Sequence, residues 1–242
     1  MSGYREIADY YDLLTENVDF ESYIEFVDGV FKKNNVNGVV LDAGCGTGRV
    51  LSLLSRRGYD LIGVDKSPEM LSVAAKKQTG ALLLQQDLTQ LDLYGTVSGA
   101  LSTMDVVNHL SSAGDVRRFF SRLALFMEPG GIFIFDMNLP YKHETILANN
   151  SFVFEFSKGM LVWRNEPKRG RVLIILDIYI LNKNGTYERK QEELYEYTYS
   201  LEEISRLAGV DFEIIETKDG ETFKGLTEHS QRAVLVARKR KG

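Results

Sequence analysis

The chain has 242 residues, of which 44% are hydrophobic and 26% charged. This length and composition predict one large globular domain with a sizeable core, and they exclude disordered, collagenous and fibrous chains. No apolar run approaches the ~18 residues of a membrane-spanning helix, no secretory signal is visible, and the one cysteine cannot pair within the chain. We therefore expect a protein of the reducing cytoplasm with no membrane partner.

Charge is unevenly distributed along the sequence. Removing the four positive charges of residues 238–241 from the net charge of −5 leaves −9, and residues 1–30 hold eight acids against one base. Because nucleic-acid binding depends on clustered cations, this balance disfavours a nucleic-acid partner. The four basic residues are expected to form a solubilising tail.

Helical and strand patterns alternate over the first 138 residues. Residues 4–14 and 21–33 have the apolar spacing of amphipathic helices. Strands are then predicted at 39–41, 61–64, 82–84, 97–102 and 132–135, with helices between them that carry 50–54, begin at 67–69 and carry 116–126. The strands are continuously apolar, which predicts a mostly parallel sheet covered by helices on both faces. Ligands of such sheets bind beyond the carboxyl ends of the strands.

A different pattern begins near residue 150. Polar and apolar residues alternate, with turn signals between the segments, which predicts an antiparallel insertion of four strands at 152–156, 160–164, 172–181 and 186–200. Tyr195, Tyr197, Tyr199 and Trp163 are interpreted as one aromatic face that forms the core of this insertion, and a substrate wall is the alternative. A helix at 201–208 and strands at 212–216 and 233–237 follow.

The most informative stretch is a glycine loop after the first strand, with Gly44, Gly46 and Gly48. Such a loop turns the chain sharply and brings backbone N–H groups and a helix N-terminus close to a ligand. A dinucleotide fingerprint needs a small residue where Arg49 or Leu51 stands, and no Gly-Lys-Ser/Thr closes a phosphate-binding loop. The spacing therefore disfavours both kinds of nucleotide site, including that of a nucleotide-dependent oxidoreductase.

Three acidic residues mark the ends of three successive strands. Asp42 would repel a pyrophosphate and suits a cationic amino group. Asp65 stands where an acid can accept both hydroxyls of a ribose, and Asp87 can accept the amine of a purine. A ligand with an amine, a ribose and an adenine, and without phosphate, would satisfy all three.

The series Asp42-x-Gly44-x-Gly46-x-Gly48, Gly63-Val64-Asp65-x-Ser67-x-Glu69-Met70-Leu71 and Gln86-Asp87-Leu88 resembles the motifs of class I S-adenosylmethionine-dependent methyltransferases over residues 36–138. The resemblance implies an α/β, Rossmann-like, seven-stranded sheet whose last two strands, at 212–217 and 232–238, form a reversed hairpin at one edge. It places Gly44 and Gly46 at the methionine part of the cofactor S-adenosyl-L-methionine, Asp65 at the ribose, and Asp87 with Leu88 at the adenine.

The segments Tyr11-Asp12, Asp19-Phe20 and Asn108-His109-Leu110 are also similar to a small bacterial subgroup of that family, in which an antiparallel insertion follows the fifth strand. By this resemblance the chain divides into N-terminal helices that form a lid (1–35), a cofactor-binding core (36–149), a substrate lid (150–200) and the end of the core sheet (201–242).

The candidate cofactor-binding residues are Tyr11, Asp42, Gly44, Cys45, Gly46, Asp65, Lys66, Met70, Asp87, Leu88, Thr103 and Met104. Cys45 is expected to contribute its backbone rather than its thiol. The candidates for a general base are His109, His143 and Tyr141, and the scattered histidines predict no metal site.

The resemblance implies methyl transfer by in-line displacement, and the expected acceptor is a small molecule. A cation or amine would suit the acidic N-terminal surface. Leu101–Asp105 lacks the Asn/Asp-Pro-Pro-Tyr signature of exocyclic-amine modification. The alternatives are a non-catalytic cofactor-binding or regulatory domain and an RNA or protein methyltransferase, and both a monomer and a homodimer stay open.

Overall fold

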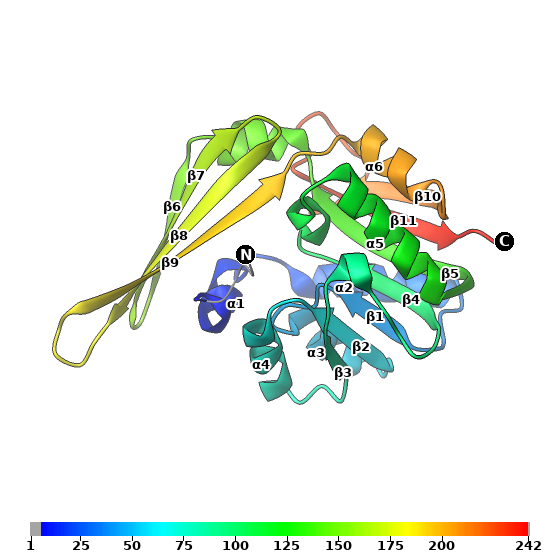
Figure 1. Ribbon diagram of the computed structural model, residues 1–242, viewed down its shortest axis with the longest axis horizontal. Coiled ribbons are helices and arrows are strands. Elements are labelled where there is room, and N and C mark those ends of the chain that lie inside the picture. Colours follow the sequence, from blue (N-terminus) through cyan, green and yellow to red (C-terminus); the bar gives the residue numbers. More distant parts are fainter. Residues whose placement is uncertain (1–5, 242) are drawn as a thin grey trace.

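The computed structural model describes residues 6–241 and contains two β-sheets (Figure 1). Strands β3, β2, β1, β4 and β5 of the larger sheet are parallel, and β11 and β10 run antiparallel at its edge. The predicted sheet and its reversed hairpin are therefore confirmed. In spatial order the strands are β10 (Phe212–Asp219), β11 (Arg232–Lys239), β5 (Met127–Asn138), β4 (Val97–Ser102), β1 (Val40–Ala43), β2 (Leu61–Asp65) and β3 (Leu82–Gln85).

Helices cover both faces of the larger sheet, as predicted. Side chains of α5 (Ala113–Phe126) and α6 (Leu201–Ala208) pack into one apolar core, and those of α2 (Phe20–Lys33) and α3 (Arg49–Ser55) pack into the other. Helix α4 (Pro68–Lys76) lies beside β2 and β3. None of the helices within residues 6–241 is long and apolar enough to cross a membrane.

Alternation along β5 places one acid inside the molecule. Phe133 and Phe135 point into the core with α5, whereas Ile134 points into the core with α2 and α3. Because alternate residues of a strand share a face, Asp136 lies on the side of Ile134 and faces α2. It is fully buried there.

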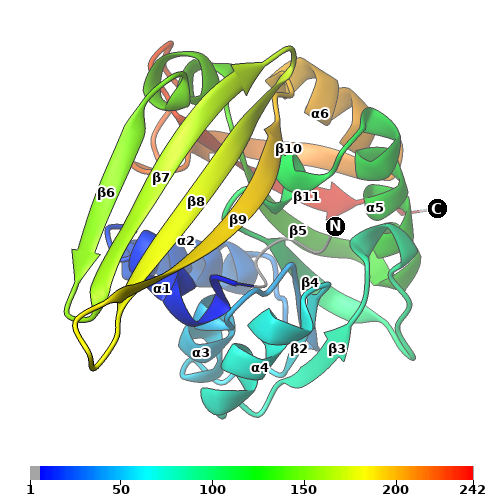
Figure 2. The same cartoon turned by 60° about the vertical axis from the view of Figure 1, so that its left-hand side comes forward.

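The second sheet is the predicted antiparallel insertion, which stands apart from the larger sheet in Figures 1 and 2. Its strands are β6 (Ser151–Phe156), β7 (Gly159–Lys168), β8 (Arg171–Leu181) and β9 (Tyr187–Tyr197). One face is apolar and carries Leu161, Ile174, Leu176 and Leu194. Residues 6–19, which we call the N-terminal segment, lie between this face and the larger sheet.

The first predicted helix is shorter than expected. A 3-10 turn, η1 (Ala8–Tyr10), leads into a single helical turn, α1 (Tyr11–Leu14), and residues 4 and 5 lie outside the described range. Ile7 and Leu14 pack against the insertion. Because this tertiary contact sets the shape of the segment, the amphipathic spacing is met by short turns rather than by one continuous helix.

The insertion tyrosines do not share a face with Trp163, contrary to the prediction. Tyr195 and Tyr197 are opposite Leu173 and Arg171, whereas Trp163 is opposite Leu176 on the apolar face. The guanidinium of Arg171 lies 4.3 Å from the Tyr195 ring centroid, and Tyr199 packs into the core of the larger sheet. The grouping was wrong because the register between strands cannot be read from one strand alone.

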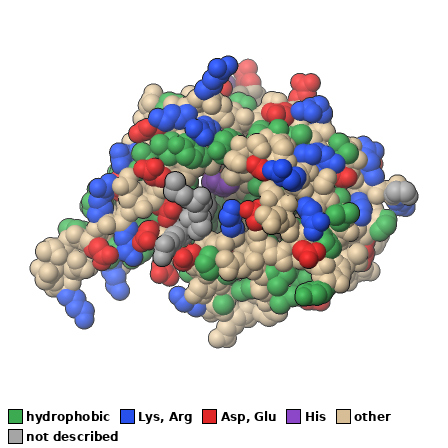
Figure 3. Space-filling view, in the orientation of Figure 1, with side chains coloured by type: hydrophobic (Ala, Val, Ile, Leu, Met, Phe, Trp, Pro, Cys, Tyr) green, Lys and Arg blue, Asp and Glu red, His purple; other side chains and the backbone are tan. Residues whose placement is uncertain are grey.

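The basic residues near the C-terminus are not simply a solvated tail. Arg238 and Lys239 belong to β11, where the Arg238 guanidinium donates to Asn34 (2.9 Å) and the Lys239 ammonium donates to the Met127 carbonyl (2.7 Å). On the face seen in Figure 3, acidic and basic side chains are interspersed.

Candidate active site

A cavity of about 80 Å³ lies beyond the carboxyl ends of β1, β2 and β4, and we call it the strand-end cavity. Its walls include the glycine loop, the loop after β4 and part of the N-terminal segment. Nine of the twelve predicted cofactor-binding residues line it: Tyr11, Asp42, Gly44, Cys45, Gly46, Asp65, Met70, Thr103 and Met104. The structure therefore brings together residues from four separate segments of the chain.

The first two glycines of the glycine loop differ in the space beside them. Gly44 and Gly46 have φ angles of +87° and +52°, which side chains rarely adopt. A Cβ on Gly44 would lie 2.5 Å from Val106, whereas one on Gly46 would meet nothing within 4 Å. The loop is thus packed against the protein at Gly44 and open at Gly46.

Asp42 is buried in β1, and its carboxylate is unsatisfied. Neither Oδ1 nor Oδ2 has a hydrogen-bond partner among the described residues, although the side chain is 1% exposed and lines the cavity. Burial, and then the charge of Asp65, raise the pKa of Asp42 to about 7. Buried polar groups are normally paired, so this carboxylate is a strong sign that the cavity takes a cationic or hydrogen-bond-donating ligand.

Asp65 ends β2 and ties two loops together. Its Oδ2 accepts the Gly46 N–H and its Oδ1 accepts the Ser67 N–H, both at 2.8 Å. Burial raises the pKa of Asp65 despite these bonds. The Ser67 side chain accepts the Met70 N–H, so α4 begins as the sequence predicted.

Three predicted cofactor residues do not line the strand-end cavity. Asp87 accepts a hydrogen bond from the Thr89 N–H (2.9 Å) and forms an ion pair with Lys66 (2.8 Å). Burial acts to raise the pKa of Asp87, but these two interactions outweigh it and lower that pKa. Leu88 is buried in the core with α5. Their predicted contacts with an adenine stay predictions.

The N-terminal segment closes one side of the strand-end cavity. Asp12 accepts a hydrogen bond from the Thr47 hydroxyl (2.6 Å) and from the Lys77 ammonium (2.9 Å). These bonds outweigh burial and lower the pKa of Asp12. One acidic side chain therefore fastens the segment to both the glycine loop and α4.

A larger cavity of about 480 Å³ opens between the insertion and the core, and we call it the insertion cavity. Its apolar wall comes from the insertion and includes Phe152, Phe154 and Trp163. Tyr11 and Met104 line both cavities, so the two adjoin. The π-helical turn η4 (Lys142–Leu147), which sequence patterns did not predict, supplies another part of its wall.

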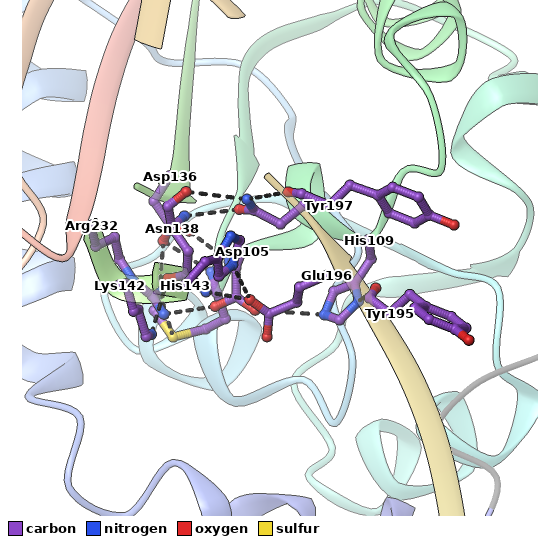
Figure 4. A network of polar contacts seen from close by, with 12 residues as sticks. Asp105, His109, Asp136, Asn138, Lys142, His143, Tyr195, Glu196, Tyr197 and Arg232 are labelled. Atoms are coloured by element: carbon purple, nitrogen blue, oxygen red, sulfur yellow. Dashed lines mark hydrogen bonds and ion pairs between the residues drawn. The ribbon is translucent and has the colours of Figure 1, made fainter. Parts of the chain in front are cut away.

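The polar wall of the insertion cavity is built around Asp136 (Figure 4). Its carboxylate accepts the backbone N–H groups of Met104 (2.9 Å) and Asp105 (2.6 Å), the Tyr23 hydroxyl (3.1 Å) and the Arg232 guanidinium (3.3 Å). Met104 and Asp105 have positive φ angles of 59° and 57°. The buried acid thus holds the loop after β4 in an unusual conformation.

Asp105 and His109 form a second part of this network. The Arg232 guanidinium donates to Asp105 at 2.6 Å, and the His109 Nε2 lies 3.5 Å from the other oxygen of Asp105. His109 Nδ1 donates to the Tyr195 carbonyl at 3.1 Å. Burial acts to lower the pKa of His109, but the Asp105 bond and the charge of Glu196 outweigh it, so that pKa is raised.

Glu196 of β9 completes the network from the insertion. Its Oε2 accepts Asn138 Nδ2 at 2.7 Å and His143 Nε2 at 2.9 Å. His143 Nδ1 contacts the Thr198 hydroxyl at 2.8 Å, and the Lys142 ammonium donates to Asn138 Oδ1 at 3.0 Å. This strand of the insertion is therefore bonded to the end of β5 and to η4.

Among the described residues, Asp105, His109 and Glu196 each offer one ligand atom within 4.8 Å of the others, which is close enough to hold a metal ion. The Arg232 guanidinium 2.6 Å from Asp105 already supplies a positive charge there. The predicted absence of a metal centre stays a prediction.

The three candidate bases have different positions. His109 lines the strand-end cavity, whereas His143 is buried behind Glu196 and lines neither cavity. Tyr141 lies beside His229, with ring centroids 5.4 Å apart, and also lines neither.

Sequence reasoning did not single out Asp136, Asn138, Lys142, Glu196 and Arg232 as site residues. One signal was available for two of them. Asp136 interrupts the apolar run of β5, and Glu196 interrupts an alternating strand on its inward face.

Comparisons with known proteins agree with this geometry. Residues 41–135 match the family model described as a methyltransferase domain. A protein of Geobacillus sp. (strain WCH70) that carries a provisional methyltransferase name is 27% identical over 98% of this chain and 99% of its own length. The crystal structure of an S-adenosylmethionine-dependent methyltransferase from Clostridium acetobutylicum superposes with a TM-score of 0.88 at 26% identity, covering 98% of this chain and 99% of that one.

Residues 41–135 therefore form a methyltransferase domain, and the chain has the fold of the class I S-adenosylmethionine-dependent methyltransferases. The methyltransferase-domain match spans β1 to β5, which carry the glycine loop, Asp65 and Asp105. A third relative, a dTDP-3-amino-3,4,6-trideoxy-alpha-D-glucopyranose N,N-dimethyltransferase of Streptomyces venezuelae, is 28% identical over 53% of this chain and 56% of its own. The insertion of this methyltransferase lies outside the family-model match.

Proposed function

We propose that this methyltransferase binds S-adenosylmethionine in the strand-end cavity and transfers its methyl group to a small molecule in the insertion cavity. The observation that carries the proposal is the buried carboxylate of Asp42, which has no partner among the described residues. A cofactor with a cationic amino group would supply the missing charge and hydrogen-bond donors.

The other residues of the strand-end cavity suit the remaining parts of that cofactor. Gly46 leaves open space beside its backbone, so a ligand can approach the loop closely. Asp65 is already fixed by two backbone N–H groups, and its other lone pairs remain for a ribose diol. Met70 and Met104 offer apolar contact to the rest of the molecule.

The strand-end cavity is smaller than the ~300–1,000 Å³ of most ligand sites. Tyr11, Asp12 and Thr15 of the N-terminal segment form part of its wall. We infer that this segment is a lid that moves outward when the cofactor enters. The hydrogen bonds of Asp12 with Thr47 and Lys77 would hold the lid closed. A closed lid excludes water from a reactive complex.

A small-molecule acceptor is supported by the insertion cavity. Its volume of about 480 Å³ lies in the range of small-molecule sites. The Streptomyces venezuelae relative is named for a small substrate, a nucleotide-linked amino sugar. When bound, S-adenosylmethionine supplies a methyl group that is already activated, so the protein's part is to align the acceptor with it and to exclude water.

A thermal-shift panel tests the cofactor. S-adenosylmethionine and S-adenosylhomocysteine should each raise the melting temperature, since ligands that bind only the folded state stabilise it, while NAD should leave it unchanged. No shift with the first two compounds would contradict the proposal.

Turnover distinguishes an enzyme from a non-catalytic binding domain. The protein is incubated with methyl-labelled S-adenosylmethionine and a pool of small metabolites, and labelled products are sought by mass spectrometry. Binding without any labelled product, in this pool or in matched RNA and protein pools, would favour the non-catalytic alternative.

A further inference from the structure

The insertion cavity combines an apolar wall with an excess of acidic groups. Aromatic rings from the insertion, including Phe152, Phe154 and Trp163, line one side. The ionisable residues that line the cavity, apart from tyrosine, are Asp19, Asp105, Lys142, Glu196, Glu221 and Arg232. Four acids against two bases give the cavity a net negative charge when all six are ionised.

The two bases are already engaged. Arg232 is paired with Asp105 at 2.6 Å and with Asp136 at 3.3 Å. The Lys142 ammonium donates to Asn138, and burial together with the charge of Arg232 lowers the pKa of Lys142. Neither base is hydrogen-bonded or ion-paired with Glu196, so the negative charge of Glu196 has no direct Lys or Arg partner among the described residues.

Glu196 is held rigidly by one oxygen only. Asn138 and His143 both donate to Oε2, whereas no described residue is bonded to Oε1. The side chain is 3% exposed and lines the cavity. A carboxylate can accept several hydrogen bonds, so Oε1 remains able to receive donors from a ligand.

Glu196 also lies where the two cavities adjoin. One of its oxygens is within 4.8 Å of a ring nitrogen of His109, and His109 lines the strand-end cavity. A ligand group bonded to Oε1 would therefore lie beside the proposed cofactor site rather than at the far end of the insertion cavity.

We infer that the methyl acceptor carries a protonatable amine on an apolar body, and that Glu196 positions the amine nitrogen through Oε1 while the aromatic wall receives the body. This inference rests on the proposed function, because it assigns the insertion cavity to the acceptor. Glu196 accepts an N–H from the ammonium or from the free amine, so it orients the nitrogen in either protonation state.

The ionisation of Glu196 agrees with this role. Burial and the charge of Asp105 act to raise its pKa, but the His143 hydrogen bond and the charges of both histidines outweigh them, so the pKa is lowered. The carboxylate is thus available as an anion at neutral pH. Charge-assisted hydrogen bonds to an ammonium are stronger than those to a neutral hydroxyl.

The test compares three probes of one shape, benzylamine, benzyl alcohol and benzoate. Their binding to the full chain saturated with S-adenosylhomocysteine is measured by isothermal titration at pH 7. We expect the amine to bind about tenfold more tightly than the alcohol, and benzoate to bind most weakly. This order needs no variant, so it remains testable if a substitution prevents folding.

Variants then assign the preference to Glu196. In Glu196→Gln the amine should lose about tenfold in affinity while the alcohol and S-adenosylhomocysteine keep theirs, and Glu196→Asp should retain part of the preference. Glu193→Gln, an exposed acid on the same strand, is the matched control and should behave as the wild type.

Two results would overturn the inference: wild-type protein that binds no amine more tightly than the alcohol, or Glu196→Gln that keeps the full amine preference. Failure to bind S-adenosylhomocysteine is a separate outcome. It would overturn the proposed cofactor site and leave the order of the three probes to be measured without it.

Discussion

The residues that line the strand-end cavity lie closer together in the sequence than those that line the insertion cavity. Most of the strand-end cavity comes from loops between residues 42 and 109, each following its own strand. The insertion cavity is assembled from the N-terminal segment, η4, the insertion and β11. The first is therefore specified by local motifs, whereas the second depends on pairs such as Asn138 with Glu196, which are 58 residues apart.

The largest effect is expected from the group that holds the second cavity together. Replacing Asp136 by Asn leaves the buried Arg232 without one of its partners and weakens the bonds to the loop after β4. Breaking a buried ion pair typically costs about 3–5 kcal/mol. Urea unfolding should show a loss of that size, and exposed Glu213→Gln on β10 should stay within about 0.5 kcal/mol of the wild type.

A substitution in the strand-end cavity should weaken the binding of S-adenosylhomocysteine as well as the stability of the fold. Asp65→Ala removes a carboxylate that accepts two backbone N–H groups. In the proposed site this carboxylate also accepts hydrogen bonds from the ribose, and hydrogen bonds to charged groups contribute about 1.5–3 kcal/mol each. We therefore expect S-adenosylhomocysteine to bind about 100-fold more weakly by isothermal titration. Asp60→Ala, an exposed acid just before the start of the same strand, is the control. Equal affinity in both variants would remove Asp65 from the proposed site.

The raised pKa of Asp42, in the strand-end cavity, predicts that the free energy of unfolding depends on pH. Its pKa is raised from 3.8 to about 7, so the folded state prefers the protonated acid. Without ligand, the free energy of unfolding contributed by this group is fully present below about pH 4 and is lost as the pH rises towards 7, by on the order of 1 kcal/mol per pH unit.

The difference in unfolding free energy between the wild type and Asp42→Asn, measured between pH 4 and 8, should show this loss. Saturating S-adenosylmethionine should reduce it, since a cationic amino group stabilises the ionised carboxylate. A flat difference over this range would contradict the assignment.

The smallest effect concerns the lid. Asp12→Asn weakens the bonds to Thr47 and Lys77, which are partly exposed and worth about 1 kcal/mol. We expect S-adenosylhomocysteine to dissociate several-fold faster in stopped-flow measurements. Asp9→Asn, whose carboxylate lies 3.6 Å from Lys76 on the surface, should leave the rate unchanged. Identical rates in both variants would separate the segment from cofactor release.

Much of the larger sheet and of the strand-end cavity could be predicted from the sequence. Continuous apolar strands, the Ser67 cap and the glycine turn are consequences of local backbone geometry and side-chain period, which are written in short stretches of chain. The structure agrees at β4, at α4 and at the positive φ angles of Gly44 and Gly46.

Other features depended on tertiary contacts that no local pattern encodes. The sequence by itself determined the parallel sheet and the carboxylates at the strand ends, and the family resemblance implied the reversed edge of the sheet. Only the folded chain decided that Trp163 faces the cavity while Tyr195 does not, that Arg232 reaches Asp105 across 127 residues, and that Glu196 meets His143. The physical reason is that strand register and the packing of separate segments bring these groups together, and neither is set by the spacing of residues within one segment.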